Sequence, residues 1–383
     1  MKNRQLGRRD FLVGLTGVAA AAASRSTSAA SVPTWMYVGS FTGEGRGHGE
    51  GLSVFHRGSE SDRWQRVQLL TDLADPSFVI VDSQKRCLYA VHGDGTQATA
   101  YRIDPANGRV SVLNQQPTGG RNGVHLAIDA TGRVLVMVNY ATGTVAVLPI
   151  NQDGSLGSRS DLATLSGALG PHRSQQETSH PHHCPFDPAG RLVIVPDKGL
   201  DKVFVFRVDA ARGALVPATP PAVATRAGAG PRHAGFHPTR PFAYVINELD
   251  STITVYAFDA ENGALAPRQV HTTLPSSYTG NNTGAEIAVA PSGRFVYGSN
   301  RGHDSIAIFA VDQSTGVLTS VGWEPTQGKT PRYFGLDPTG THLYAANQSS
   351  DTVVIFRVNQ TTGKLSPTGE TIDVKSPVTI AFR

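Results

Sequence analysis

The amino-acid sequence predicts an all-β protein, a seven-bladed β-propeller in which strands from the two ends of the chain complete one blade. Three observations lead to this fold class. The composition, with 39 % hydrophobic and 17 % charged residues, 41 Gly and 24 Pro, is that of a turn-rich globular protein. A four-strand pattern recurs about every 50 residues along the chain. The chain also carries, at its two ends, the two halves of one further copy.

Each copy of the repeat has an apolar strand, a tight turn, a second strand ending near Asn, and a third strand of alternating apolar residues. A polar turn and an edge strand follow. The turn between the first two strands provides an anchor position, and its copies are Asp82, Asp129, Asp187, His237, Ala290 and Asp337. Asp, Gly and Pro supply the backbone angles that such turns need. Each copy therefore predicts one four-stranded blade.

The seventh blade is divided between the ends of the chain. The segment 376–382 resembles a first strand that has no partner after it, and the segment 35–39 resembles a second strand that has none before it. Joining them closes the ring and removes two exposed sheet edges. We therefore expect a single propeller domain that covers residues 31–383.

The first 30 residues are predicted to be an export signal. Arg8 and Arg9 precede a moderately apolar stretch at 12–23, and Ser28-Ala29-Ala30 offers small residues for cleavage. This pattern is typical of a twin-arginine signal, which predicts the twin-arginine export machinery as a partner and a periplasmic location. A short membrane anchor is the alternative, but the stretch is Gly/Ala-rich and too short to span a bilayer. We expect no stable membrane insertion.

Charge and cysteine content exclude other classes of function. The net charge of +4 comes without a basic run, so nucleic acid is not expected as a partner. The basic excess fits solvated surface charge, and it would also fit an anionic substrate. The two cysteines, Cys87 and Cys184, fall in non-adjacent repeats and are expected to be buried thiols without a disulfide. No Cys/His spacing resembles a zinc site, and no metal or cofactor is predicted.

Reactive side chains gather at two positions of the repeat. The first strand begins and the second strand ends at the same edge of each blade, so both positions should face one mouth of the central channel. Five and four residues before the anchors stand His182, Arg232 and Arg332, then His125, His183, His233 and Glu286. Eleven residues after the anchors stand Glu248 and Arg301, among others. Charged groups that converge on a rigid scaffold predict an active site.

A structural role is the alternative for each of these residues taken alone. A single His at a strand start is commonly a satisfied polar group, and Arg232 or Glu248 could form an ion pair between blades. The Asn residues ten positions after the anchors are expected to cap turns through their own side chains. The polar segment 166–179 is an insertion between blades, expected to form a loop over one face.

Two segments of the chain resemble a known family. Gly228 to Pro238 reads Gly-Ala-Gly-Pro-Arg-His-Ala-Gly-Phe-His-Pro, and Tyr244 to Leu249 reads Tyr-Val-Ile-Asn-Glu-Leu. Both resemble bacterial 6-phosphogluconolactonases, which are seven-bladed propellers related to fungal carboxy-muconate lactonizing enzymes. The resemblance extends over nearly the whole chain after the signal and implies chemistry on a lactone without a metal.

The resemblance also implies roles for particular residues. It points to His182, Arg232 and Glu248 as catalytic groups, with Arg301 as a further cation. The family pattern before His182 matches Glu177 and His180, which become candidate substrate-binding residues together with His125, His183, His233, Glu286 and Arg332. Gln175 stands where the family pattern has Arg, and Ser179 where it has Pro. The missing Arg argues against a phosphorylated substrate, as does export.

The predicted activity is hydrolysis of a sugar lactone, either glucono-1,5-lactone or its 6-phosphate. His182 is the first candidate for the general base, and Glu248 is the second candidate or the group that orients the base. The arginines would stabilise the oxyanion or bind a substrate anion. No Gly-x-Ser-x-Gly elbow is present, which argues against a serine hydrolase. The alternatives are a cyclase acting on an unsaturated dicarboxylic acid and a non-enzymatic binding propeller.

Overall fold

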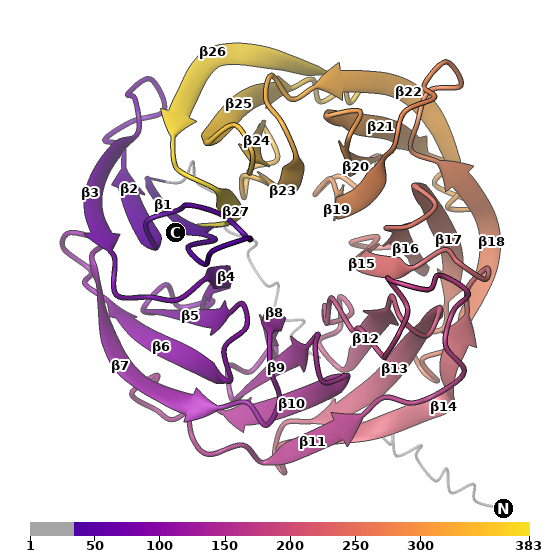
Figure 1. Cartoon of the computed structure of the whole chain (residues 1–383), viewed down its shortest axis with the longest axis horizontal. Helices are drawn as coiled ribbons and strands as arrows, with labels where there is room; N and C mark the ends of the chain where they lie inside the picture. Colours follow the sequence, from indigo (N-terminus) through magenta and orange to yellow (C-terminus); the bar gives the residue numbers. More distant parts are fainter. Residues whose placement is uncertain (1–33) are drawn as a thin grey trace, which may run out of the picture. The chain divides into compact units, whose positions relative to one another are not determined.

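Seven small antiparallel sheets stand around a central channel in the computed structural model, which describes residues 34–383 (Figure 1). The predicted export signal at residues 1–30 lies outside the described residues. Within residues 34–383, no helix is long and apolar enough to cross a membrane. The innermost strands of neighbouring sheets contact one another around the ring. The predicted all-β, seven-bladed propeller is confirmed.

One blade is built from both ends of the described chain, as predicted. Its strands, from the channel outward, are β27 (Pro377–Phe382), β1 (Trp35–Ser40), β2 (Leu52–His56) and β3 (Gln65–Leu70). Strand β1 pairs antiparallel with β27, with Met36 opposite Phe382 and Val38 opposite Ile380. This pairing covers the inner edge of β1 and closes the ring, while β27, as the innermost strand, has its other edge on the channel.

The other six sheets follow one another along the chain. Their strands are β4 (Pro76–Val81), β5 (Cys87–His92), β6 (Gln97–Ile103) and β7 (Val110–Pro117); β8 (Gly123–Ile128), β9 (Val134–Asn139), β10 (Thr144–Pro149) and β11 (Asp161–Thr164); β12 (Leu192–Asp197), β13 (Lys202–Asp209) and β14 (Ala214–Ala224); β15 (Pro231–Phe236), β16 (Phe242–Asn247), β17 (Thr252–Phe258) and β18 (Leu265–Thr272); β19 (Thr283–Val289), β20 (Phe295–Arg301), β21 (Ser305–Val311) and β22 (Leu318–Pro325); and β23 (Pro331–Leu336), β24 (His342–Asn347), β25 (Thr352–Val358) and β26 (Leu365–Asp373).

The repeated Asp of the first turn is a local cap. Asp129 accepts the backbone N–H groups of Arg133 and Val134 through Oδ1, at 2.7 and 2.8 Å. Asp82, Asp187 and Asp337 do the same in their own blades. At His237 the ring nitrogen Nδ1 takes over this role. Five of the six anchors thus supply an acceptor to the turn, and where the anchor is Ala290 the hydroxyl of Ser292 accepts the N–H of Arg294 at 3.3 Å.

The Asn residues at the ends of the second strands have the structural role that the sequence predicts. The side-chain amides of Asn139 and Asn247 donate to the hydroxyls of Thr144 and Thr252, at 3.0 and 2.9 Å. These hydroxyls lie at the start of the third strand, so each amide bridges the turn between two strands. Both cysteines are free and buried, as predicted.

One blade departs from the expected four strands. The segment 181–186 occupies the innermost position, but it joins β12 only through two isolated bridges, Pro181 with Asp197 and Phe186 with Val193. Pro181, Pro185 and Pro196 lie in this segment or opposite it. Since proline has no N–H to donate, a regular ladder cannot form here. The backbone of His182 is still attached to β12, because its N–H donates to the carbonyl of Pro196 at 3.1 Å.

Closure of the ring makes a stability prediction. Ile380 in β27 is 3 % exposed and packs in the core of the closing blade. Ile380→Asp would lose this packing and bury a carboxylate without a cationic partner, so we expect the free energy of unfolding to fall by at least about 3 kcal/mol. Chemical denaturation of the variant measures this. Thr371→Asp, at an exposed site in β26, is the matched control and should change little. Equal stability of the two variants would contradict the closing role of β27.

Candidate active site

The predicted reactive residues meet at one mouth of the channel. A cavity of about 160 Å³ lies there, lined by Arg46, Asn122, Val124, Tyr140, His182, Lys198, Glu248 and Arg332. A narrower void of about 20 Å³ lies along the channel, and its lining includes His182, Arg232, His233, Glu286 and Arg332. Val124, His182 and Arg332 contribute to both, so they stand between the open mouth and the closed interior.

Glu248, which directly follows β16, holds three cations. Its Oε2 lies 3.0 Å from Nε of Arg232 and 3.4 Å from Nη2 of Arg301, and its Oε1 lies 3.4 Å from Nζ of Lys198. The three cations come from the blade of Glu248 itself and from the two blades on either side. A single carboxylate thus connects three blades at the mouth.

The charged groups in this cluster shift one another's pKa values. Burial alone would raise the pKa of Glu248, but Arg301, Lys198 and Arg232 together lower it to about 2. Burial and the nearby Arg301 lower the pKa of Arg232 to about 10. Both groups stay charged at neutral pH. Arg232 is further fixed by its Nη1, which donates to the carbonyl of Ala285 at 2.6 Å.

Arg332 is the least committed of the guanidinium groups at the mouth. Its guanidinium carbon lies 4.9 Å from the ring centre of Phe41, and Arg46 approaches the same ring at 5.1 Å. Within residues 34–383, no carboxylate lies at ion-pair distance from Arg332. Arg46, by contrast, pairs with Asp94 at 2.8 Å. The Arg332 side chain is therefore the cation most available to a bound anion.

Four histidine rings pack together, with His182 at the mouth and His125, His183 and His233 beneath it. The rings of His125 and His183 lie 3.8 Å apart, those of His183 and His233 lie 4.2 Å apart, and those of His182 and His233 lie 5.0 Å apart. Burial lowers the pKa of every one of them, to about 3 for His125. For His182, the cations Arg232 and Arg332 add to this effect. All four rings are therefore neutral at physiological pH.

Two of these histidines take part in a hydrogen-bonded chain with a carboxyl group. Nδ1 of His182 lies 3.1 Å from Nε2 of His233, and Nδ1 of His233 lies 2.9 Å from Oε1 of Glu286. The backbone N–H of Ile287 also donates to Oε1 of Glu286, at 3.0 Å. Burial raises the pKa of Glu286 to about 8, although Arg232 opposes this effect. The two carboxyl groups of the site thus differ in charge at neutral pH.

His183, His233 and Glu286 place three potential metal ligands within 4.8 Å of one another. Their geometry does not suit an ion. A ring nitrogen binds a metal in the plane of its ring at about 2.0 Å, whereas the rings of His183 and His233 are stacked with an angle of 14° between their planes. Two stacked rings cannot both point at one ion. Nδ1 of His183 is also occupied, because it accepts the backbone N–H of Ala234 at 3.1 Å.

The insertion at 166–179 lies against the rim of the mouth. Gln176 is buried and its side-chain amide donates to the carbonyl of Lys198 at 2.7 Å, and Gln175 accepts from Nζ of Lys198 at 2.9 Å. His180 follows the insertion and stacks on Tyr140 with 4.3 Å between ring centres. Glu177 is exposed and lines neither of the two cavities. The structure therefore separates Glu177 from the other predicted residues.

The remaining predicted residues are brought together, with His180 at the rim and the others in two layers. Arg232, Glu248, Arg301, Arg332 and His182 form the mouth, while His125, His183, His233 and Glu286 form the layer below. Sequence reasoning missed several residues that line the two cavities, among them Phe41, Arg46, Tyr140 and Lys198. Lys198 stands at the same repeat position as Glu248 and could have been chosen on that ground. Phe41 and Arg46 lie in the loop after β1, outside the repeat, where no pattern marks them.

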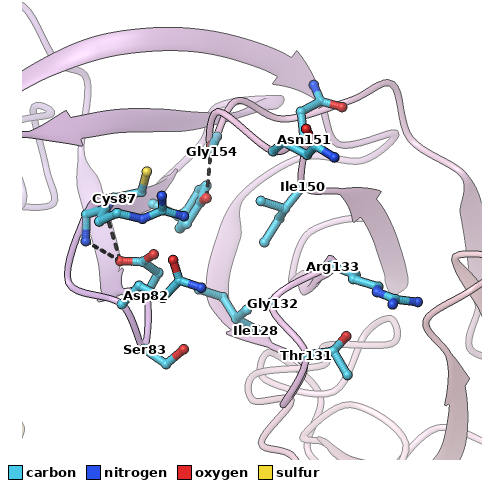
Figure 2. A pocket seen from close by; sticks show the side chains of 14 residues that line it. Asp82, Ser83, Cys87, Ile128, Thr131, Gly132, Arg133, Ile150, Asn151 and Gly154 are labelled. Carbon is cyan, nitrogen blue, oxygen red and sulfur yellow. Dashed lines mark hydrogen bonds between the residues drawn. The ribbon is translucent and has the colours of Figure 1, made fainter.

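A second groove lies at the opposite ends of the strands, between the blades of β4–β7 and β8–β11 (Figure 2). Its volume is about 280 Å³. Two polar groups of this groove have structural partners. Asp82 accepts the backbone N–H of Cys87 at 2.9 Å, and the hydroxyl of Tyr89 donates to the carbonyl of Gly154 at 2.9 Å. The groove lacks the converging charges of the mouth, so it is not our candidate site.

The fold and the site define a class of protein, a seven-bladed propeller with a buried cluster of charged and imidazole groups at one mouth of its channel. The family profile described as "Lactonase, 7-bladed beta-propeller" matches residues 35–382. The chain belongs to this lactonase family. It is 35 % identical to a 6-phosphogluconolactonase of Bacillus subtilis over 79 % of this chain and 84 % of the relative.

Two further relatives carry similar names. A 6-phosphogluconolactonase of Formosa agariphila is 33 % identical over 79 % of this chain and 86 % of the relative. The structure of a periplasmic gluconolactonase of Pseudomonas aeruginosa superimposes with a TM-score of 0.84 and 30 % identity, over 91 % of this chain and 98 % of that one.

The charge cluster predicts a pH-dependent contribution of Glu248 to stability. The folded pKa of about 2 lies below the ordinary 4.5, so the ionised group stabilises the fold above pH 4.5 and loses this effect as the pH falls toward 2. We expect Glu248→Gln to lower the free energy of unfolding by on the order of 3 kcal/mol at pH 7. Chemical denaturation between pH 7 and pH 2.5 should show the gap closing in acid. Glu261→Gln, at an exposed turn, is the control, and a gap that does not depend on pH would refute the assignment.

Proposed function

We propose that this chain is an enzyme that hydrolyses a sugar lactone at the channel mouth, with His182 as general base and the surrounding arginines as the groups that stabilise negative charge. The observation that carries the proposal is a neutral, buried imidazole that lines a cavity rich in cations. The names of the relatives agree with this chemistry.

The reaction requires one base and one oxyanion site. Nε2 of His182 makes no hydrogen bond within residues 34–383, whereas Nδ1 is held by His233. As the oxygen of a water molecule attacks the lactone carbonyl carbon, its proton moves to this nitrogen. When the bond between the carbonyl carbon and the ring oxygen breaks, the same proton passes to that oxygen and gives the hydroxy acid. The lowered pKa of His182 keeps its ring unprotonated before the attack, and the negative charge that develops on the carbonyl oxygen favours the proton that the ring then accepts.

Glu248 has a different role from that of a base. Its pKa of about 2 makes it a weak proton acceptor, and both of its oxygens face cations. We assign it the orientation of Arg232 and Arg301, whose guanidinium groups also donate to the carbonyls of Ala285 and Gly284. Among the residues that the structure describes, Arg332 has no such partner, and it is the best placed to receive the developing oxyanion or a substrate anion.

The substrate that fits best is a lactone such as glucono-1,5-lactone, with the 6-phosphate as the second candidate. Gln175 occupies the place of the family's arginine and binds Lys198 through its amide oxygen. One cation fewer therefore faces the mouth than in the family pattern, which favours the substrate without a phosphate group.

Lactone opening by the chain from Ser31 tests the activity, after correction for spontaneous hydrolysis. We expect faster opening of glucono-1,5-lactone than of its 6-phosphate. His182→Ala should lower turnover by at least about 100-fold, because general bases contribute that much or more. His271→Ala, on the outer strand β18, is the matched control.

The outcomes separate the alternatives. Near-normal turnover by folded His182→Ala would remove His182 from the mechanism. No opening of either lactone by the folded wild type would contradict the proposal and favour a cyclase, tested on an unsaturated dicarboxylic acid. Inactivity in both assays would favour a binding propeller.

We also propose that residues 1–30 export the chain through the twin-arginine machinery to the periplasm. The paired arginines Arg8 and Arg9 support this, and the Pseudomonas relative is described as periplasmic. In cells that express the full chain, Arg8→Lys with Arg9→Lys should move most of the protein from the periplasmic to the cytoplasmic fraction. Arg4→Lys, outside the pair, should leave the distribution unchanged. Equal periplasmic amounts in both variants would contradict this route.

A further inference from the structure

The chain of hydrogen bonds that leads from the mouth to Glu286 links two imidazole rings with one carboxyl group. His182, His233 and Glu286 are 5 %, 3 % and 5 % exposed. Each link is short, at 3.1 Å between the rings and 2.9 Å between His233 and Glu286. Each link can hold only one hydrogen, so the position of one proton determines the position of the next.

Two arrangements of protons satisfy this chain. When Glu286 is ionised, His233 donates from Nδ1 to the carboxylate and accepts at Nε2 from Nδ1–H of His182. Nε2 of His182 then carries a free lone pair. When Glu286 is protonated and donates to Nδ1 of His233, the direction reverses. His233 then donates from Nε2 to Nδ1 of His182, and the proton of the neutral His182 ring lies on Nε2.

We propose that Glu286 and His233 are positioning residues that determine which ring nitrogen of His182 carries the proton, so that His182 accepts a proton from water only when Glu286 is ionised. This inference rests on the proposed lactone hydrolysis for its effect on turnover. The tautomer change itself would occur without any substrate. Neither Glu286 nor His233 needs to touch the lactone.

The neighbouring histidines, His125 and His183, cannot change tautomer in the same way. Backbone N–H groups donate to Nδ1 of His183 from Ala234 and to Nδ1 of His125 from Cys184, at 3.1 and 3.2 Å. These contacts fix both rings as acceptors at Nδ1. Only the pair of His182 and His233 is connected ring to ring by a hydrogen bond, among the residues that the structure describes.

Other charged and titratable groups surround this chain of hydrogen bonds. Glu286 faces Arg232 on one side and Tyr333 on the other, with His183 close to its carboxyl group. His182 faces Arg232, Arg332 and Lys198, which disfavour an imidazolium form. Since the rings stay neutral, a proton shift along the chain changes the tautomers of the two rings without charging either of them.

The titration of Glu286 then gives the pH range of the change. Burial raises its pKa to about 8, so the carboxyl group is largely protonated at pH 6 and largely ionised at pH 9. Oε2 of Glu286 is buried and has no hydrogen-bond partner within residues 34–383, so Oε1 is the oxygen that forms the hydrogen bond with His233. Turnover should therefore rise with pH and level off above about 8.

The first arm of the test measures kcat and KM for glucono-1,5-lactone between pH 6 and 9. In the wild type, kcat should rise about tenfold per pH unit below 8, with little change in KM. Glu286→Gln has no group that ionises in this range, so the rise should disappear while KM stays similar. Glu324→Gln changes a half-buried carboxyl group outside the channel and should keep the wild-type profile.

The second arm observes the tautomer directly and needs no activity. In full-length protein with ¹⁵N-labelled histidine, the ring couplings of His182 show which nitrogen is protonated, and His182→Gln identifies these signals by their loss. We expect the proton to move from Nε2 to Nδ1 between pH 6.5 and 9 in the wild type. It should not move over this range in Glu286→Gln.

The two arms distinguish the failure of this inference from the failure of the proposed function. A change of the His182 tautomer in a protein without lactonase activity would support the control by Glu286 and overturn the proposed lactone hydrolysis. Lactonase activity with a tautomer that stays constant across this range would overturn the control by Glu286 alone. If Glu286→Gln does not fold, the wild-type spectra still decide. A pH profile of Glu286→Gln identical to the wild-type profile would also overturn it.

Discussion

The structure depends on one geometric constraint, that every innermost strand begins at the same mouth of a narrow channel. A repeat position near the start of that strand therefore always reaches the channel axis, whichever blade carries it. Because the void along the channel is only about 20 Å³, the side chains that meet there must satisfy one another rather than water. The pairing of β1 with β27 closes the ring and so keeps the beginnings of the innermost strands close to the channel axis.

The charge balance of the mouth follows from this constraint. Three cations share the single ionised carboxylate of Glu248, and Arg332 adds a fourth cation without an anion of its own. Because the side chains leave little space for water, the electrostatic interactions of these cations with neighbouring groups are only weakly screened. It disfavours the imidazolium form of His182 and favours an anion above it. The same field thus keeps the base unprotonated and stabilises the negative charge that hydrolysis creates.

Sequence reasoning succeeded where the cause is local. The turn caps of Asp82, Asp129 and their equivalents need only neighbouring backbone N–H groups, so the blades and their register were predictable. The positions of His182, Arg232, Glu248 and Arg301 followed from that register. Whether Glu248 acts as a base could not be predicted from the register of the repeat. It depends on cations that neighbouring blades and strands bring to its two oxygens, and the sequence does not show those distances. Two further features were not predicted. The prolines around His182 interrupt the innermost strand of one blade, and the loop after β1 brings Phe41 and Arg46 to the site.

Glu248 and Glu286 show how neighbours divide two identical functional groups between two tasks. Both are buried, and burial alone would raise the pKa of each. Glu248 stands at the mouth among three cations and stays ionised, which suits it to hold arginines. Glu286 stands one layer below, where Arg232 is the cation that opposes burial, and it retains its proton until about pH 8. A carboxyl group that changes its protonation near neutral pH can control an adjacent imidazole, whereas one that is always ionised can only orient cations. The two layers of the channel therefore support two different roles. Glu248 at the mouth holds the arginines in place, and Glu286 beneath it gains or loses a proton near neutral pH.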